Sequence, residues 1–150
     1  MKKIMLGLFL ILGTMSFAVP NYVNTTKVKN AGYVIKNERE DILTMATSDD
    51  DSAIIISFST INMSSKEISD LLKSNALRDS GNFIATLDNN RAYINEFEAQ
   101  GFYSYMIVPK KEKVKNQHTY ATYVSSKKLS KNDLSKITNA ILDEAESYIK

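Results

Sequence analysis

The chain has 150 residues, one histidine, no cysteine and no tryptophan, and its formal net charge at pH 7 is +2. The excess positive charge comes from two lysines near the start, since residues 19–150 carry equal numbers of basic and acidic side chains. A neutral domain has no general electrostatic attraction for nucleic acid, so we expect no nucleic-acid partner. The lack of cysteine excludes disulfides, a thiol nucleophile, thiolate metal ligands and a lipid-modified cysteine.

The first 18 residues have the pattern of a bacterial secretory signal peptide. Two lysines follow Met1, an apolar run covers 4–17, and small residues then precede a cut. Ser16 and Ala18 occupy positions −3 and −1, so we expect cleavage between Ala18 and Val19. The apolar run of about 14 residues is shorter than the roughly 20 that span a bilayer. The sequence predicts a periplasmic or extracellular protein that meets the membrane only during export.

Composition divides the chain into three segments. The signal peptide covers 1–18, and the polar, aperiodic residues 19–30 predict a flexible lead-in. Residues 31–150 show regular hydrophobic patterns, and they are enough for one domain with a core but too few for two. We therefore expect a single domain over 31–150.

Strand patterns recur along this domain. Apolar or alternating runs, separated by polar turns, predict strands at 33–35, 42–45, 53–58, 83–87, 92–97, 102–108 and 119–125. The run at 53–58 is almost entirely apolar, which is typical of a strand covered on both faces. Asp88, Asn89 and Asn90 tolerate the left-handed backbone of tight turns, so we expect a hairpin there.

Two helices have clear start signals. Ser64 and Glu67 form a capping box ahead of a helical apolar spacing that should end near Asp79. Ser130 and Asp133 have the corresponding roles for a long C-terminal helix. These elements predict an α+β fold, in which both helices pack on one face of a mostly antiparallel sheet of about five to seven strands.

Three segments within about residues 83–150 show a common alternation ahead of the last helix: Asn90-Arg91-Ala92-Tyr93, Phe102-Tyr103-Ser104-Tyr105 and Tyr120-Ala121-Thr122-Tyr123. With the order of the elements, these segments resemble Mog1/PsbP-like domains. The resemblance is a likeness of topology and alternation without a signature motif, so it assigns no functional residue in this chain. It implies a small exported bacterial domain with the α+β fold described above.

No set of residues is typical of a catalytic or metal site. His118, the single histidine, ends a polar connection, where we expect an exposed turn residue. Glu96 and Glu98 would share one strand face, as paired catalytic carboxylates do, but solvated alternates of a core-facing Phe97 are the simpler interpretation. The acidic run 49–51 lacks the spacing of a calcium loop and predicts a solvated turn. We assign no catalytic residue, metal ligand or cofactor.

One connection between strands concentrates positive charge. The patch consists of Lys110, Lys111, Lys113 and Lys115. We expect a neighbouring connection to extend it into a basic rim with Lys127, Lys128 and Lys131. Such a rim could bind anionic glycans, lipid headgroups or nucleic acid. The other interpretation is a solvated hairpin tip that keeps the sheet edge soluble, and the interruption by Glu112 favours it.

Tyrosines are concentrated in the same group of strands. Alternation places Tyr103, Tyr105 and Tyr123 on one face of the sheet. On an outer face they would form an aromatic strip for a glycan, a peptide or a protein partner. Beneath the helices they would pack in the core, which is the more frequent outcome. These tyrosines and the hairpin lysines are the possible ligand surface of the chain.

Three functions remain open on the sequence alone. The leading hypothesis is non-enzymatic binding of a partner protein or of a glycan or lipid of the cell envelope. A small envelope hydrolase is an alternative, and it would need a concave pocket around Glu96, Glu98 or His118. A small-ligand carrier is another, and it would need an apolar cavity between a helix and the sheet. The sequence does not specify an oligomeric state.

Overall fold

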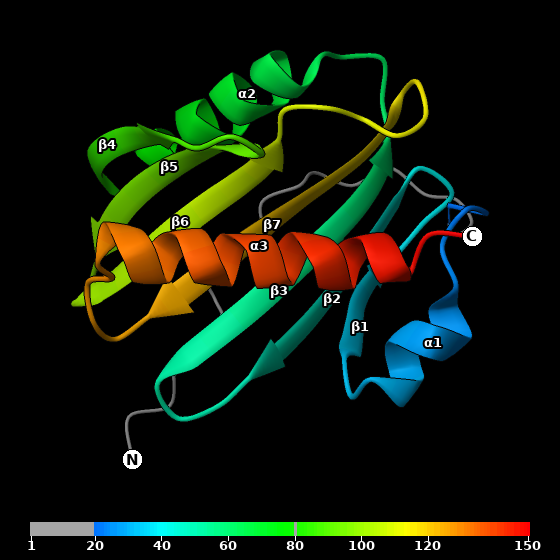
Figure 1. Cartoon of the computed structure of the whole chain (residues 1–150), viewed down its shortest axis with the longest axis horizontal. Coiled ribbons are helices and arrows are strands. Elements are labelled where there is room, and N and C mark those ends of the chain that lie inside the picture. Colours follow the sequence, from blue (N-terminus) through cyan, green and yellow to red (C-terminus); the bar gives the residue numbers. More distant parts are fainter. Residues whose placement is uncertain (1–19, 80) are drawn as a thin grey trace.

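The computed structural model describes residues 20–79 and 81–150, so the predicted signal peptide and its cut between Ala18 and Val19 lie outside the described residues. The described chain forms one sheet with three helices (Figure 1). The strands are β1 (Val34–Glu38), β2 (Ile42–Ser48), β3 (Ser52–Thr60), β4 (Asn82–Asp88), β5 (Ala92–Ala99), β6 (Phe102–Pro109) and β7 (Gln117–Ser125). The helices are α1 (Thr25–Asn30), α2 (Ser65–Arg78) and α3 (Lys131–Ser147).

The sheet has the strand order β1-β2-β3-β7-β6-β5-β4, and every neighbouring pair is antiparallel. The chain builds β1 to β3 from one edge inward and crosses through α2 to the far edge. It then returns from β4 to β7, which pairs with β3 in the centre. The α+β class, the antiparallel sheet and the long C-terminal helix are thus confirmed. The Mog1/PsbP-like resemblance stays a prediction.

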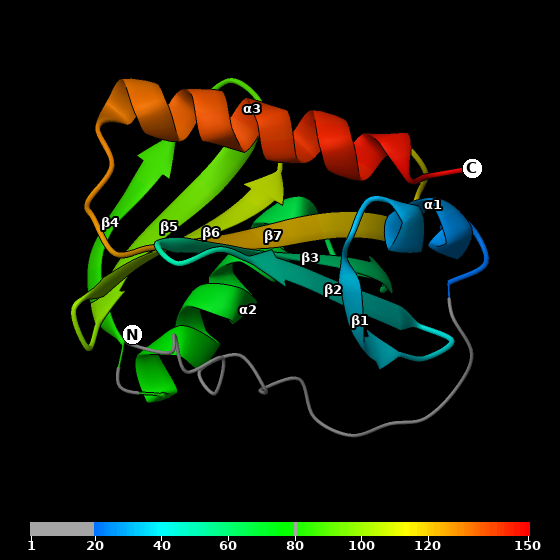
Figure 2. The same cartoon turned by 90° about the horizontal axis from the view of Figure 1, so that it is seen from below.

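The helices α2 and α3 lie on opposite faces of the sheet (Figure 2), so the expectation that both pack on one face was wrong. The helix α2 packs on β5 and β6, where Asn95 Nδ2 donates to the backbone oxygen and the Oγ of Ser69 at 3.2 and 3.0 Å. The strands explain the arrangement, because their alternate residues are buried on both faces. In β5, Ile94 belongs to the core under α3, while Phe97 faces the other way and contacts Phe83.

A continuous apolar core lies between α3 and the sheet. The sheet contributes the fully buried side chains of Leu43, Met45, Ile56, Phe58, Tyr105 and Ile107. The helix contributes Leu134, Ile141, Leu142 and Ala145, which form the apolar stripe that its sequence predicts. Full burial of each large apolar side chain stabilises the fold by about 1.5–3 kcal/mol. This face of the sheet therefore carries much of the stability.

Residues 20–30, expected within a flexible lead-in, belong to the fold instead. Asn24 Oδ1 accepts a hydrogen bond from Lys27 N at 3.0 Å and caps α1. The segment runs beside the C-terminus, since Asn24 N donates to Tyr148 O at 2.8 Å. Val28 is fully buried. The prediction failed because one buried valine in a polar hexapeptide gives no periodicity.

The predicted capping signals are confirmed at both long helices. Ser64 Oγ accepts from Glu67 N at 3.2 Å, and Ser64 N donates to Glu67 Oε2 at 2.7 Å. Ser130 Oγ accepts from Asp133 N at 3.1 Å. These bonds satisfy backbone donors that a helix start otherwise leaves unpaired. Among the described residues, no helix has the length and apolar character needed to cross a membrane.

Candidate functional site

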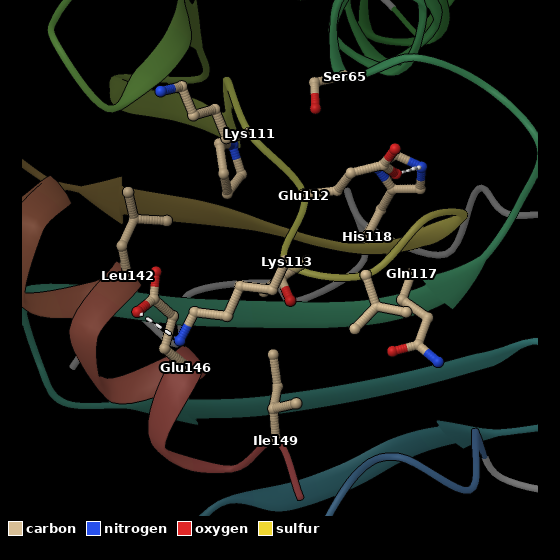
Figure 3. Close-up of a pocket in the computed structure, with 12 residues that line it drawn as sticks. Ser65, Lys111, Glu112, Lys113, Gln117, His118, Leu142, Glu146 and Ile149 are labelled. Carbon is tan, nitrogen blue, oxygen red and sulfur yellow. Dashed lines mark ion pairs between the residues drawn. The ribbon is translucent and has the colours of Figure 1, made fainter.

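The predicted lysine patch lies on the connection between β6 and β7, and Figure 3 shows two of its members, Lys111 and Lys113. Lys113 Nζ lies 2.9 Å from Glu146 Oε2, which ties this connection to α3. Lys110 Nζ lies 5.5 Å from the centre of the Tyr93 ring. The other two lysines of the patch are exposed. Part of the patch thus holds the hairpin against the domain.

The second group of lysines does not extend this patch. Lys127, Lys128 and Lys131 lie on and just after the connection from β7 to α3, at the opposite end of β7 from the hairpin tip (Figure 1). A strand of 9 residues is about 30 Å long. The expected basic rim was therefore wrong, because β7 itself separates the two connections.

His118 is buried in β7 with 3% of its surface exposed, so the expectation of an exposed turn residue was wrong. Its Nε2 lies 3.0 Å from Glu112 Oε2 of the hairpin but makes no hydrogen bond of normal geometry. Asn116 N donates to the same carboxylate oxygen at 3.0 Å. The polar connection is shorter than its composition suggests, because His118 already pairs with Ser59 of β3.

His118 and Glu112 line a small pocket of about 40 Å³ with Ser65 from the first turn of α2. Figure 3 shows His118 and Glu112 facing each other, while Lys113 turns toward Glu146. Within the described part of the chain, no hydrogen bond joins Ser65 to His118, so the three groups do not form a catalytic relay. The pocket has room for a few water molecules, and its contacts fix the hairpin.

Glu96 and Glu98 share one face of β5, as predicted, and this face lies under α3. Glu96 is 4% exposed, so the expectation of solvated carboxylates was wrong for this residue. Its cross-strand neighbour Tyr105 pairs in turn with Tyr123, which fixes the side of the sheet. His118 lies five residues before Tyr123 in β7 and therefore faces the opposite side. The candidate catalytic groups are thus far apart.

Tyr103, Tyr105 and Tyr123 also share the face under α3. Tyr105 is fully buried, and its hydroxyl accepts a hydrogen bond from Leu129 N at 2.8 Å. The Tyr105 and Tyr123 ring centres are 6.5 Å apart. Tyr103 and Tyr123 are half-buried against the core. Tyr105 therefore packs in the core, as one of the two interpretations predicts, and the three rings do not form an outer aromatic strip.

The acidic run 49–51 is organised as a turn. Asp49 Oδ1 accepts from Asp51 N at 2.9 Å and from Ser52 N at 2.7 Å. These bonds hold the pKa of the Asp49 carboxyl below its usual range. Over residues 20–79 and 81–150, no group of three or more acidic or histidine side chains is placed to hold a metal ion.

A larger hollow, of about 210 Å³, lies between α2 and the strands β2, β3 and β7. Its apolar wall consists of Ile42, Ile61, Ile68, Leu71 and Leu72. Its polar lining consists of Arg39, Asp41, Ser59, Thr60 and Tyr120. The hollow exists because α2 packs over β5 and β6 and flanks the neighbouring strands of the same face (Figure 2). We call it the α2 hollow.

Two polar side chains lie next to each other in the lining of the α2 hollow. Ser59 is 7% exposed, and its Oγ has no hydrogen bond of normal geometry among the described residues. Burial raises the pKa of Tyr120 to about 12, while hydrogen-bonding interactions with the side chains of Ser57 and Ser59 lower it. Ser59 and Tyr120 thus interact with each other inside the lining, and the apolar wall is the larger part of the hollow.

Sequence reasoning did not identify the α2 hollow. One signal was available, since Leu71 continues the apolar spacing of α2 yet is 40% exposed. Ser57 and Ser59 are a second signal, because they interrupt an apolar strand and indicate that one of its faces is more polar than the other. The hollow depends on where α2 crosses the sheet, and the pattern of a single sequence does not specify that position.

Comparisons with known proteins identify no relative. No protein-family model matches the chain, and searches of curated proteins and of solved structures give no match. A function must therefore be inferred from the geometry of the described residues.

Proposed function

We propose that this chain acts after export as a non-enzymatic binding domain that receives an apolar side chain of a partner protein in the α2 hollow. One observation carries the proposal: a hollow of about 210 Å³ with a wall of five apolar side chains lies beside α2. An apolar cavity of about 150 Å³ can hold benzene, so the hollow has room for one aromatic or branched side chain. Such buried anchors dominate the affinity of protein–protein complexes.

The rim of the hollow favours a polypeptide over the other envelope components. Arg39 and Asp41 place charges of both signs there. A polypeptide has polar groups and charges of both signs around its apolar side chains, whereas an anionic lipid surface is attracted by a patch of one sign. Leu71 extends the apolar surface outward at the rim. A partner side chain could thus be buried while its flanking residues meet polar groups.

The hydrolase alternative has less support. His118 lines the pocket of about 40 Å³, and Glu96 lies on the opposite face of the sheet. Acid–base and nucleophilic catalysis need their groups within hydrogen-bond reach of one another. A small-ligand carrier would use the same α2 hollow as a protein partner, so the test must distinguish these two occupants.

Export is part of this proposal, and its support is the pattern of basic, apolar and small residues at 1–18. The mature chain should begin at Val19. Mass spectrometry of the protein recovered from the periplasm or the medium measures this directly. Full-length chain in the cytosol, with residues 1–18 retained, would contradict it.

The binding site is tested by photo-crosslinking from α2. A photoreactive amino acid replaces Leu71 at the rim of the hollow or, as the matched control, Leu77 on the same helix. The two leucines are 40% and 49% exposed, but only Leu71 lines the hollow. In cells that express the exported chain, we expect one discrete protein adduct from position 71 and none from position 77.

The adduct protein is then purified and its affinity measured. We expect Leu71→Asp to weaken binding at least tenfold and Leu77→Asp to change it by less than twofold. Equal effects of the two substitutions would contradict the proposal. If the adduct at position 71 adds only the mass of a small molecule, the occupant of the hollow is a small ligand and the proposal of a protein partner is wrong.

A further inference from the structure

The buried carboxylate of Glu96 has no part in the α2 hollow, which lies on the other face of the sheet. Glu96 is 4% exposed, and its Oε1 has no hydrogen-bond partner in the described part of the chain. The carboxylate has a hydrogen-bonding interaction with the Tyr105 side chain, but a buried negative charge is normally also offset by an adjacent positive charge. The position of Glu96 therefore points to a cationic partner.

Tyr105 lies beside this carboxylate. Tyr105 is directly opposite Glu96 on β6, and Tyr123 is next to Tyr105 on β7. Burial raises the pKa of Tyr105; a hydrogen bond from Leu129 N lowers it, and the nearby Glu96 carboxylate raises it. Glu98 lies on the same face two residues along β5. The surroundings are thus acidic, which suits an ammonium group that can also donate hydrogen bonds to the carboxylate.

Lys128 supplies the only ammonium recorded at this carboxylate in the described chain. Its Nζ lies 3.6 Å from Glu96 Oε1, and its side chain is 54% exposed. The backbone on either side is held separately, because Lys127 N and Leu129 N donate hydrogen bonds to the side chains of β7 and β6 at 3.1 and 2.8 Å. The path of this connection therefore does not depend on the ion pair.

We infer that Glu96, beside Tyr105, forms a binding site for a primary ammonium group, which the exposed, tethered side chain of Lys128 occupies and can vacate. The ammonium of a lysine or alkylamine reaches the carboxylate while much of its aliphatic stem stays outside, as in Lys128, whose side chain is 54% exposed. A free amine and the lysine of a polypeptide share this chemistry. The site lies on the α3 face and is independent of the proposed partner binding in the α2 hollow.

The tether keeps the site closed in the wild-type chain. A group held by a short linker has an effective concentration in the millimolar range, and an external amine must compete with it. Removal of the Lys128 side chain leaves the carboxylate and the rings in place. The variant Lys128→Ala should therefore bind external amines that the wild type excludes.

The experiment is a chemical rescue of Lys128→Ala with butylammonium chloride. A ligand that binds the folded chain raises its melting temperature in a saturable way. We expect this rise for Lys128→Ala, and an apparent affinity at least tenfold weaker for the wild type. Tetramethylammonium chloride at equal ionic strength, which has no N–H donor, should have no effect. Lys127→Ala is the matched control and should respond like the wild type.

A second substitution identifies the site. In the double variant with Glu96→Gln the rescue should disappear, because the amide carries no charge. If that variant does not fold, the Tyr105 ring resonances of Lys128→Ala are followed by NMR, and they should shift with the same affinity. Rescue that survives Glu96→Gln, that also occurs in Lys127→Ala, or that leaves Tyr105 unshifted would overturn the inference, as would no rescue.

The source of the ammonium is distinguished by a parallel titration. The tripeptide Ala-Lys-Ala, with blocked ends, replaces butylammonium. Tighter binding of the tripeptide would assign the site to a lysine of a polypeptide. Tighter binding of butylammonium would assign it to free amines. Either result requires the saturable binding described above, whose absence overturns the inference.

Discussion

The two faces of the sheet differ in what their side chains do. On β3, Ile56 and Phe58 are fully buried in the core beneath α3, whereas Ser57 and Ser59 alternate with them on the other face. The first face is filled with apolar side chains, and the second leaves the α2 hollow beside its helix. The comparison indicates that the two faces have different roles: one stabilises the fold, and the other is open to a partner.

The largest expected effect separates the two faces on a single strand. Phe58→Ala removes a fully buried ring from the α3 core and should lower the free energy of unfolding by about 3–5 kcal/mol. Ser57→Ala, one residue away on the other face, loses a hydroxyl contact of 3.0 Å with Thr44 and should cost about 0.5–1.5 kcal/mol. Urea unfolding measures both. Similar losses of unfolding free energy in the two variants would contradict the proposed difference between the faces.

A smaller effect is expected where α2 joins the sheet. Asn95→Ala removes the two hydrogen bonds to Ser69 and the acceptor of a bond from Thr86 Oγ1 at 2.9 Å. The loss should be about 1–3 kcal/mol, because the buried Ser69 then lacks this partner. Hydrogen exchange should show faster opening in α2 than in α3. Equal acceleration in both helices would mean that α2 is not an independent part of the fold.

The capping box of α2 gives a weaker, pH-dependent effect. The backbone and side-chain hydrogen bonds from Ser64 lower the pKa of Glu67 from its usual 4.5. A carboxyl with a lowered folded pKa contributes stability above its unfolded pKa, and this contribution is lost as the pH falls through the folded pKa. Glu67→Gln should therefore be less stable than the wild type at neutral pH, and the difference should shrink below about pH 4.5. Urea unfolding curves whose difference is constant with pH would contradict this.

The smallest effect is expected inside the α2 hollow. The Ser59 hydroxyl is buried without a hydrogen bond of normal geometry among the described residues, so its removal sacrifices no bond. Ser59→Ala should leave the free energy of unfolding unchanged or raise it by up to about 1 kcal/mol. Urea unfolding beside Ser57→Ala, on the same face of the same strand, provides the comparison. A loss larger than that of Ser57→Ala would mean that Ser59 has a structural partner.

The sequence predicted the parts of the fold that depend on local pattern. The starts of α2 and α3 follow from Ser64 with Glu67 and from Ser130, and the alternation in 102–108 assigns each face of β6 correctly. These features depend on residues close together in the chain, so the local sequence is enough to predict them.

The sequence could not predict features that depend on which elements meet. In β5, Glu96 and Asn95 are polar but buried, because α3 and α2 cover opposite faces of the same strand. His118 was assigned to a turn since its pairing with β3 arises only when β7 enters the centre of the sheet. The α2 hollow likewise follows from the path of a helix that crosses one face.

The most direct test of the α2 hollow is an NMR titration of methyl-labelled chain 19–150 with benzene as the apolar probe. An apolar cavity of sufficient size binds such a molecule. We predict saturable shifts for the methyl groups of Ile42, Ile68, Leu71 and Leu72, and none for Ile141 and Leu142 in the filled core under α3. Shifts that appear first under α3, or no saturable shift at the hollow, would contradict the account.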